Sequence, residues 1–201
     1  MNLAIRHKHL KLDQTKIDRA MRLMRAKTEQ ETVEWALDLV LAEEPILREK
    51  TKKVTHFDAS LHRLLDDLLE TMRDAPGVGL AANQVGVPLQ VAVIELEDKV
   101  TELINPQLIR ASGEVIDWEG CLSIPGFVAE AKRAQRVTVK ARDRRGKEFR
   151  IKGEDLLARA LQHEIDHLNG ILYIDYLESL EELVRVSEHP SDVEEGQAAS
   201  I

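Results

Sequence analysis

The chain has 201 residues, 43% of them hydrophobic but only 3% aromatic, which suits one ordinary domain with an aliphatic core and some extensions. Its formal net charge of −8 gives no general case for a surface that coats nucleic acid. It has no apolar run long enough to cross a bilayer, no signal-peptide core, and a single cysteine, Cys121, which excludes an internal disulfide. Together these features indicate a cytoplasmic protein.

Residues 1–43 form an N-terminal extension with a character of its own. A short polar-apolar run over residues 3–12 is compatible with a strand. Two amphipathic helical patterns follow, and Thr28 with Glu31 has the spacing of a capping box for the second helix. Basic residues outnumber acidic ones before this second helix: Arg6, Lys8, Lys11, Lys16, Arg19, Arg22, Arg25 and Lys27.

This strand-helix-helix order resembles the ribbon-helix-helix module of small repressors and antitoxins, over residues 3–43. The resemblance implies that two copies pair through their strands, giving a homodimer, and that any contact with nucleic acid is made here, by Arg6, Lys8 and Lys11. The alternative is a helical extension that packs on the main domain or on a second copy.

Residues 44–180 form the second and larger domain. An apolar stripe predicts a helix over residues 58–74, and a second amphipathic helix runs from near Glu154 to Gly170, a favourable residue just beyond a helix C-terminus. Short strands between them give an α+β fold of mixed or antiparallel strands around a central helix. Residues 181–201 are expected to be an acidic, disordered tail. The predicted strands cover residues 90–95, 102–105, 113–116, 137–141 and 148–151.

The second helix of this domain carries a possible metal site. His163 and His167 are four residues apart, so they share one helix face and can hold one metal ion. Glu164 can reach a metal-bound water as a general base. The alternative is a surface helix with two incidental histidines.

Cys121, within the sequence Glu-Gly-Cys-Leu-Ser, is the best candidate for a third ligand. Two imidazoles and a thiolate leave a fourth tetrahedral position for water, as in catalytic sites. The other interpretations of Cys121 are a small buried hydrophobic residue or a thiol nucleophile paired with histidine.

Residues 77–84, Gly-Val-Gly-Leu-Ala-Ala-Asn-Gln, form the third motif. A glycine-rich turn can cradle phosphate, but this one lacks the Lys-Ser/Thr of a P-loop. Alternatively, its small residues let the backbone pass close to a peptide-like substrate, and the side-chain amide of Gln84 donates to a developing oxyanion.

The three motifs together resemble those of peptide deformylases, over about residues 44–180. The resemblance implies a metal-dependent hydrolase that removes the formyl group from the N-terminal formyl-methionine of nascent polypeptides and releases formate. Its substrates are N-formyl-methionyl peptides emerging from the ribosome, and no membrane is involved.

The resemblance also implies roles for individual residues. Cys121, His163 and His167 hold the metal, which is Fe(II) in the cell and can be replaced by Zn, Ni or Co. Glu164 moves the proton, while Gln84 and the backbone N–H of Leu122 stabilise the tetrahedral intermediate. Val78, Leu156 and Ala160 correspond to walls of the methionine pocket, and Glu119 matches a carboxylate that pairs with an arginine, here Arg133. The substrate-binding set is therefore Val78, Gly79, Glu119, Leu156 and Ala160.

Two features depart from the family pattern. The basic N-terminal extension is additional, and the strand that usually precedes Pro-x-Leu-Arg is replaced by residues 36–43, which have a helical pattern. Either this segment is nevertheless a strand, or the domain has lost an edge strand.

Two other functions compete with the deformylase interpretation. A zincin-type protease would need a ligand downstream of the helix, where His189 in the tail is the only histidine. A DNA-binding regulator with a repurposed second domain is the other.

Overall fold

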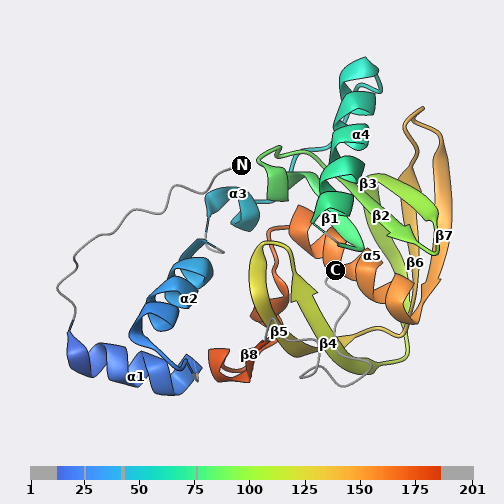
Figure 1. The fold of residues 1–201 in the computed structure, drawn as a ribbon. Coiled ribbons are helices and arrows are strands. Elements are labelled where there is room, and N and C mark those ends of the chain that lie inside the picture. The colour runs from blue at the N-terminus through green and yellow to red at the C-terminus, as the bar shows by residue number, and fades with distance from the viewer. Residues whose placement is uncertain (1–12, 25, 42–43, 76, 187–201) are drawn as a thin grey trace. The chain divides into compact units, whose positions relative to one another are not determined.

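The computed structural model describes residues 13–24, 26–41, 44–75 and 77–186, and the chain divides into two compact units, Met1–Asp38 and Leu39–Ile201 (Figure 1). The first unit contains helix α1 (Gln14–Met24) and most of helix α2 (Glu29–Leu41). The hydroxyl of Thr28 accepts from the backbone N–H of Glu31 at 3.1 Å, which confirms the expected cap of the second helix. The strand predicted within residues 3–12 lies outside the described residues.

Helix α2 settles the question raised by residues 36–43. The helix continues to Leu41, so no strand stands at this place among the described residues, and the helical interpretation is confirmed. Helix α3 (Pro45–Arg48) follows, with proline at its start, where a missing N–H costs no hydrogen bond.

The second unit is built on two antiparallel sheets. The larger has the strand order β1-β2-β3-β6-β7 and the smaller has the order β4-β5-β8. The strands are β1 (Gly79–Ala81), β2 (Val91–Leu96), β3 (Lys99–Ser112), β4 (Val115–Cys121), β5 (Ile124–Arg133), β6 (Arg136–Arg142), β7 (Glu148–Glu154) and β8 (Val184–Arg185). The 3₁₀ helices are η1 (Ala82–Val85), η2 (Tyr173–Tyr176) and η3 (Leu180–Glu182).

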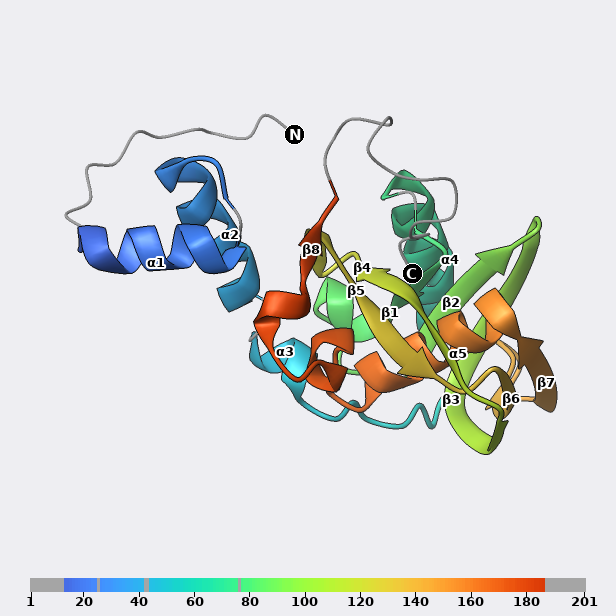
Figure 2. The same ribbon diagram turned by 90° about the horizontal axis from the view of Figure 1, so that it is seen from below.

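Two long helices cover opposite faces of the larger sheet. Helix α4 (Ala59–Asp74) packs with Val91, Val93 and Ile104 in one apolar cluster. Helix α5 (Asp155–Leu168) packs with Val137 and Val139 in the other. Because strand side chains alternate between faces, β6 buries its odd-numbered residues under α5. Helix α5 also contacts the β4–β5 hairpin, so it lies between the two sheets (Figures 1 and 2).

The predicted elements agree with this architecture, except that three strands were not predicted and that the tail was expected to begin too early. The predicted helices correspond to α4 and α5, and the five predicted strands to β2, β3, β4, β6 and β7. Strands β1, β5 and β8 were not predicted. Residues 180–182 form η3 and β8 pairs with β5, so the disordered tail expected from residue 181 does not begin there. Residues 187–201 lie outside the described part, and a tail there stays a prediction. Among the described helices, none is long and apolar enough to cross a membrane.

Candidate metal centre

Helix α5 brings two histidine rings together. His163 and His167 are one helical turn apart, and their Nε2 atoms lie 3.1 Å from each other. Both residues are buried, with exposed fractions of 2% and 1%. The rings meet edge to face at an interplanar angle of 75°, so both Nε2 atoms point at the same small volume.

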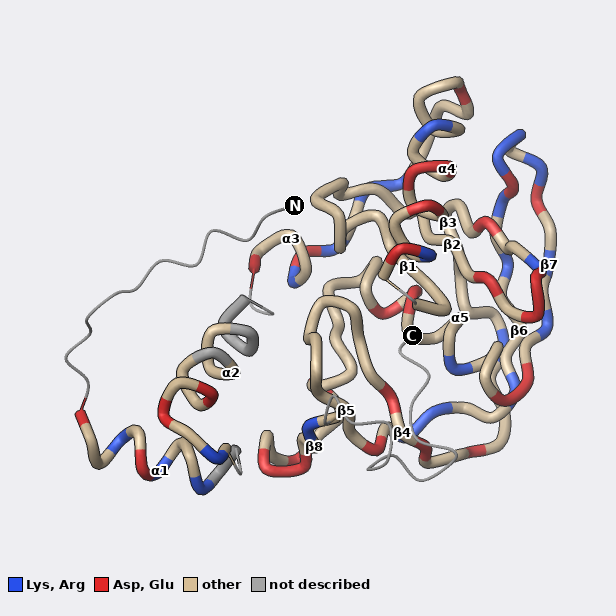
Figure 3. Tube along the Cα trace, viewed as in Figure 1, with Lys and Arg blue, Asp and Glu red and all other residues tan. Residues whose placement is uncertain are grey.

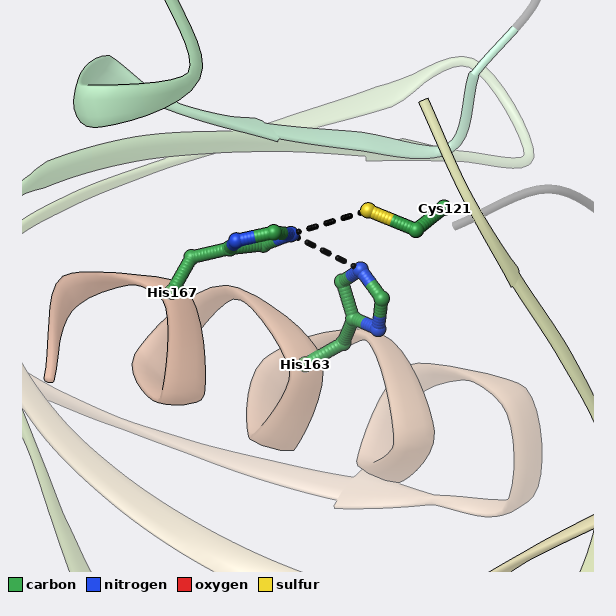
Figure 4. Close-up of side chains that lie close together, drawn as sticks. All are labelled: Cys121, His163 and His167. Carbon is green, nitrogen blue, oxygen red and sulfur yellow. Dashed lines mark hydrogen bonds between the residues drawn. The ribbon is translucent and has the colours of Figure 1, made fainter. Parts of the chain in front are cut away.

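Cys121 reaches the same volume from the end of β4. Its Sγ lies 3.2 Å from the Nε2 of His167, and the three potential ligand atoms are all within 4.8 Å of one another (Figure 4). The pairing of β4 with β5 shifts register between Gly120 and Cys121, so a tight turn follows the cysteine directly. The backbone N–H of Ser123 donates to Sγ at 3.4 Å, which fixes the position of the sulfur.

This cluster fits a divalent cation. Tetrahedral zinc has Zn–N distances near 2.0 Å and Zn–S near 2.3 Å, which places neighbouring ligand atoms about 3.3–3.6 Å apart, close to the separations found here. Burial raises the pKa of the Cys121 thiol, but the charges of His167 and His163 and their hydrogen bonds hold it well below its usual range. A thiolate and two imidazoles form a donor set for a transition metal. In the described part of the chain, no fourth His, Cys, Asp or Glu joins the group.

A buried carboxylate fixes the orientation of His163. Glu119 accepts from the Nδ1 of His163 at 2.6 Å and is fully buried. The guanidinium of Arg133 donates to both oxygens of Glu119, at 2.9 and 2.6 Å. Burial raises the pKa of Glu119, but its hydrogen bonds to Arg133 and His163 outweigh that effect and lower the pKa to about 2. An ionised Glu119 keeps the proton of His163 on Nδ1 and leaves Nε2 free for a metal.

Arg133 extends this network to the surface. It donates to Asp166 at 2.5 Å, and the hydroxyl of Tyr176 donates to the same Asp166 oxygen at 2.9 Å. The guanidinium carbon of Arg133 also lies 4.4 Å from the centre of the Tyr176 ring. Asp166 and Tyr176 were not expected from the sequence to take part in the site. The spacing of Asp166, three residues after His163, was the available signal, because it places the carboxylate on the adjoining helix face.

Glu164 is the one carboxylate of the site without a hydrogen-bond partner. It is fully buried, and neither of its oxygens is bonded by any described residue. Burial raises its pKa to about 7. Gly79 leaves the space that the carboxylate occupies: a Cβ at this position would lie 2.9 Å from the Cδ of Glu164. Such a group can take up and release a proton near neutral pH.

The glycine-rich motif brings Gln84 to the same place. Its side-chain oxygen accepts from the backbone N–H of Ala81 at 2.8 Å. Its amide nitrogen donates to the hydroxyl of Ser123 at 3.1 Å and to the Sγ of Cys121 at 3.7 Å. The three motifs of the sequence therefore converge on one site, with an amide donor beside the thiolate.

Comparison with known proteins agrees with this geometry. A family model described as polypeptide deformylase matches residues 36–183. A peptide deformylase of Heliobacterium modesticaldum is 54% identical over 136 residues, which cover 68% of this chain and 90% of the relative. One from Dehalococcoides mccartyi is 49% identical over 157 residues, covering 76% and 94%. The chain belongs to the peptide deformylase family. Removal of N-formyl groups from nascent peptides is its activity, as the sequence predicted.

Solved structures of deformylases match the same region. The crystal structure of the Legionella pneumophila enzyme has a TM-score of 0.68 at 48% identity and covers 70% of this chain and 85% of that one. A deformylase of Synechococcus elongatus, solved in complex with actinonin, has a TM-score of 0.68 at 42% identity, covering 70% and 78%. The α+β deformylase fold expected from the sequence is confirmed.

The remaining residues singled out in this deformylase lie on α5 or next to strands β1 and β4. Ala160 and Leu156 precede His163 on α5 by about one and two turns, and Ala160 is fully buried. The carbonyl of Val78 accepts from the N–H of Glu95 at 2.9 Å, which continues the β1–β2 pairing beyond the strand. Leu122 lies in the turn that follows Cys121, with its side chain against the α4 cluster.

Proposed function

We propose that Cys121, His163 and His167 hold one divalent cation and that Glu164 carries the proton in hydrolysis of the formyl group. The observation that supports this most is the buried, unpartnered carboxylate of Glu164 beside three convergent ligand atoms. A charged carboxylate without hydrogen bonds is costly inside a protein, so its position argues for a chemical role.

Fe(II) is the proposed metal, with Zn, Ni or Co able to substitute, because a thiolate with two imidazoles suits each of these ions. When bound, the cation supplies Lewis-acid chemistry to water and to the formyl oxygen. The thiolate makes an Fe(II) form sensitive to peroxide, because Cys121 is then open to oxidation.

Glu164 serves both halves of the reaction. Its carboxylate accepts a proton from the attacking water as the new C–O bond forms, and it then donates that proton to the departing nitrogen as the C–N bond breaks. The products are formate and a peptide with a free amino group. A pKa of about 7 lets Glu164 act as base and then as acid at neutral pH.

Gln84 and Leu122 stabilise the oxyanion. The side-chain amide of Gln84 and the backbone N–H of Leu122 flank the thiolate, and both are donors for the formyl oxygen as it becomes negative. Gln84 is held in place because its carbonyl oxygen is fixed by Ala81.

The methionine side chain of an N-formyl-methionyl peptide is proposed to contact Val78, Leu156 and Ala160. Ala160 and Leu156 share the helix side of His163, so their apolar side chains border the reacting centre. Gly79 acts here by making room for Glu164. Glu119, first grouped with the substrate-binding residues, is fully buried and bonded to His163, so its proposed role is to orient that ligand.

Metal removal tests the proposal directly. Protein purified without oxygen is expected to contain about one divalent metal per chain and to release formate from a formyl-Met peptide. Exhaustive chelation should abolish the activity, and added Fe(II), Ni or Co should restore it. Full activity in a chain shown by elemental analysis to be free of metal would contradict the assignment.

Replacing Gly79 with alanine should impair catalysis without emptying the site. The added methyl displaces the carboxylate of Glu164, and a shift of about 1 Å in a catalytic group costs roughly 10- to 100-fold in rate. Metal content and steady-state formate release measure the two effects. Gly86→Ala is the control: its φ of 85° makes alanine strained there, but open space surrounds the added methyl. A loss of rate in Gly86→Ala as large as that in Gly79→Ala would contradict the role of Gly79.

Residues 1–43 are proposed to pair with a second copy of the chain. The extension has 43 residues, close to the limit of about 40 below which a chain rarely buries enough apolar surface to fold alone, and it contains no cysteine for a disulfide. The full chain should therefore be a dimer, while a chain that begins at Glu44 should be an active monomer. Sedimentation of both at several concentrations measures this. A full-length chain that stays monomeric at high concentration would exclude pairing.

Nucleic-acid binding by the extension is a separate question, which a salt-dependent DNA shift assay tests.

A further inference from the structure

An exposed basic surface covers β3, β6 and β7 on the sheet face opposite α5. Its basic residues project from three adjacent antiparallel strands, and α4 covers only the β1–β3 end of this face (Figure 1). Figure 3 shows basic segments recurring along β6 and β7. This surface, here called the basic sheet face, consists of Arg110, Arg136, Lys140, Arg142, Arg150 and Lys152, with Glu148 and Glu154 at its ends.

The strand register pairs opposite charges at the two ends of this face, where Arg136 lies opposite Glu154 and Arg142 lies opposite Glu148, but like charges at its centre. Lys140 lies directly opposite Arg150, and like charges in opposed positions destabilise a sheet. Lys152 lies opposite Thr138, which offers it no counter-charge. Acidic residues outnumber basic ones in the chain, 36 to 28, so this excess runs against the overall composition. The arrangement therefore favours attraction of an anionic partner over stability of the sheet.

Most of these cations are free to bind. Arg110, Arg136, Arg150 and Lys152 are exposed and form no ion pair with any described residue. Lys140 has only a 3.8 Å contact with Glu148. A hollow of about 420 Å³ lies among Arg110, Arg136 and Lys152, so three cations and one carboxylate, that of Glu154, border a concave surface.

The residue types on this face favour a nucleic-acid duplex over an unpaired strand. One aromatic ring, that of the half-buried Phe57, borders the face beside Arg142, with the guanidinium carbon 5.9 Å from the ring centre. A single ring at one edge is not the series of rings on which successive unpaired bases stack. Cations in rows on adjacent strands instead suit phosphates held at fixed positions, as in a nucleic-acid duplex. Because the substrates are nascent peptides, RNA helices accompany them at their site of synthesis. Two of the three proposed metal ligands, His163 and His167, lie on α5, which covers the other face of the sheet, so a partner bound here leaves the catalytic site open.

We propose that the basic sheet face docks this deformylase on the phosphate backbone of double-stranded RNA, without reading base sequence. Contacts with roughly four phosphates give a plot of log affinity against log salt with a slope of about −3 to −4. This inference concerns a second surface of the enzyme, so it can fail while deformylation of free peptides remains intact.

The test compares two double charge reversals in the full chain. Arg150→Glu/Lys152→Glu alters the basic sheet face and should fold, because the carboxylate introduced at position 150 would face Lys140 across the strands. Arg19→Glu/Arg22→Glu makes the same charge change at exposed positions of α1. Binding of a labelled RNA hairpin of about 16 base pairs is followed by fluorescence anisotropy at several salt concentrations. Formate release from a free formyl-Met peptide should stay within about twofold of the parent in both variants.

The sheet variant is expected to bind the hairpin at least about tenfold more weakly and to lower the salt slope by about 2, while the α1 variant binds as the parent does. Equal weakening in both variants would indicate net charge alone, and weakening in only the α1 variant would assign binding to the N-terminal unit. Either result would overturn the proposal. So would an unstructured RNA that binds as tightly as the hairpin, or binding to anionic lipid vesicles but not to RNA.

Discussion

Replacement of Glu164 by glutamine is expected to leave the metal in place and to lower the rate of formate release by about 10²- to 10⁴-fold. Glutamine has nearly the same shape but cannot accept a proton from water. The carboxylate is not among the atoms of the Cys-His-His cluster, so its loss should not change metal affinity greatly. The variant should also fold well, because it removes an ionisable group that is buried without a partner.

Variants of the proposed metal ligands should behave differently from Glu164→Gln. Cys121→Ala and His167→Ala each remove an atom of the cluster, so both should lose the metal as well as the activity. Elemental analysis and single-turnover formate release on the three variants separate metal binding from proton transfer. A metal-free Glu164→Gln protein would show that this division of roles is wrong.

Parts of this site could be predicted because they depend on local spacing. The i, i+4 relation places His163 and His167 on one helix face whatever the rest of the fold does. The approach of Cys121 depends on tertiary structure. Ligand chemistry made this residue the best candidate for the third position, and the three motifs taken together then favoured it over the alternatives. The contact between Gly79 and Glu164 joins β1 to α5, so the motif indicated that position 79 needs a small residue but not the cause of that need.

The strands that the sequence did not predict are those that form through pairing or packing with other elements. Strand β5 has Pro125 and Gly126 near its start, and both residue types are poor signals for a strand. The strand forms because β4 and the short β8 pair with it on either side. Strand β1 has only three residues, fully buried between the two long helices. Tertiary context overrides local propensity in both cases. The same holds for Tyr176, whose position near Arg133 depends on the chain turning back after α5.

The second large effect is expected from Arg133→Met. Arg133 is the only Lys or Arg bonded to Glu119 among the described residues, and its side chain is 3% exposed. Methionine fills much of the volume but leaves the carboxylates of Glu119 and Asp166 without their shared partner. Removing one member of a buried ion pair typically costs about 3–5 kcal/mol in the free energy of unfolding. Denaturant unfolding of the metal-free chain measures that loss.

The same change should weaken metal binding through His163. Without Arg133, burial favours the protonated form of Glu119, which is a poorer acceptor for the Nδ1 proton of His163, so metal affinity should fall by about 10- to 100-fold. Competition with a chelator of known affinity measures this. The double variant Arg133→Met/Glu119→Gln also removes the carboxylate that Arg133→Met leaves unpaired, so it should recover part of the lost stability. Its metal binding should stay weak, because a neutral amide is a poorer acceptor for His163. Tyr176→Phe is the milder control: it removes one hydrogen bond to Asp166 but keeps the ring beneath Arg133. If Arg133→Met bound metal as tightly as the parent, the chain from Arg133 through Glu119 to His163 would have no part in orienting the ligand.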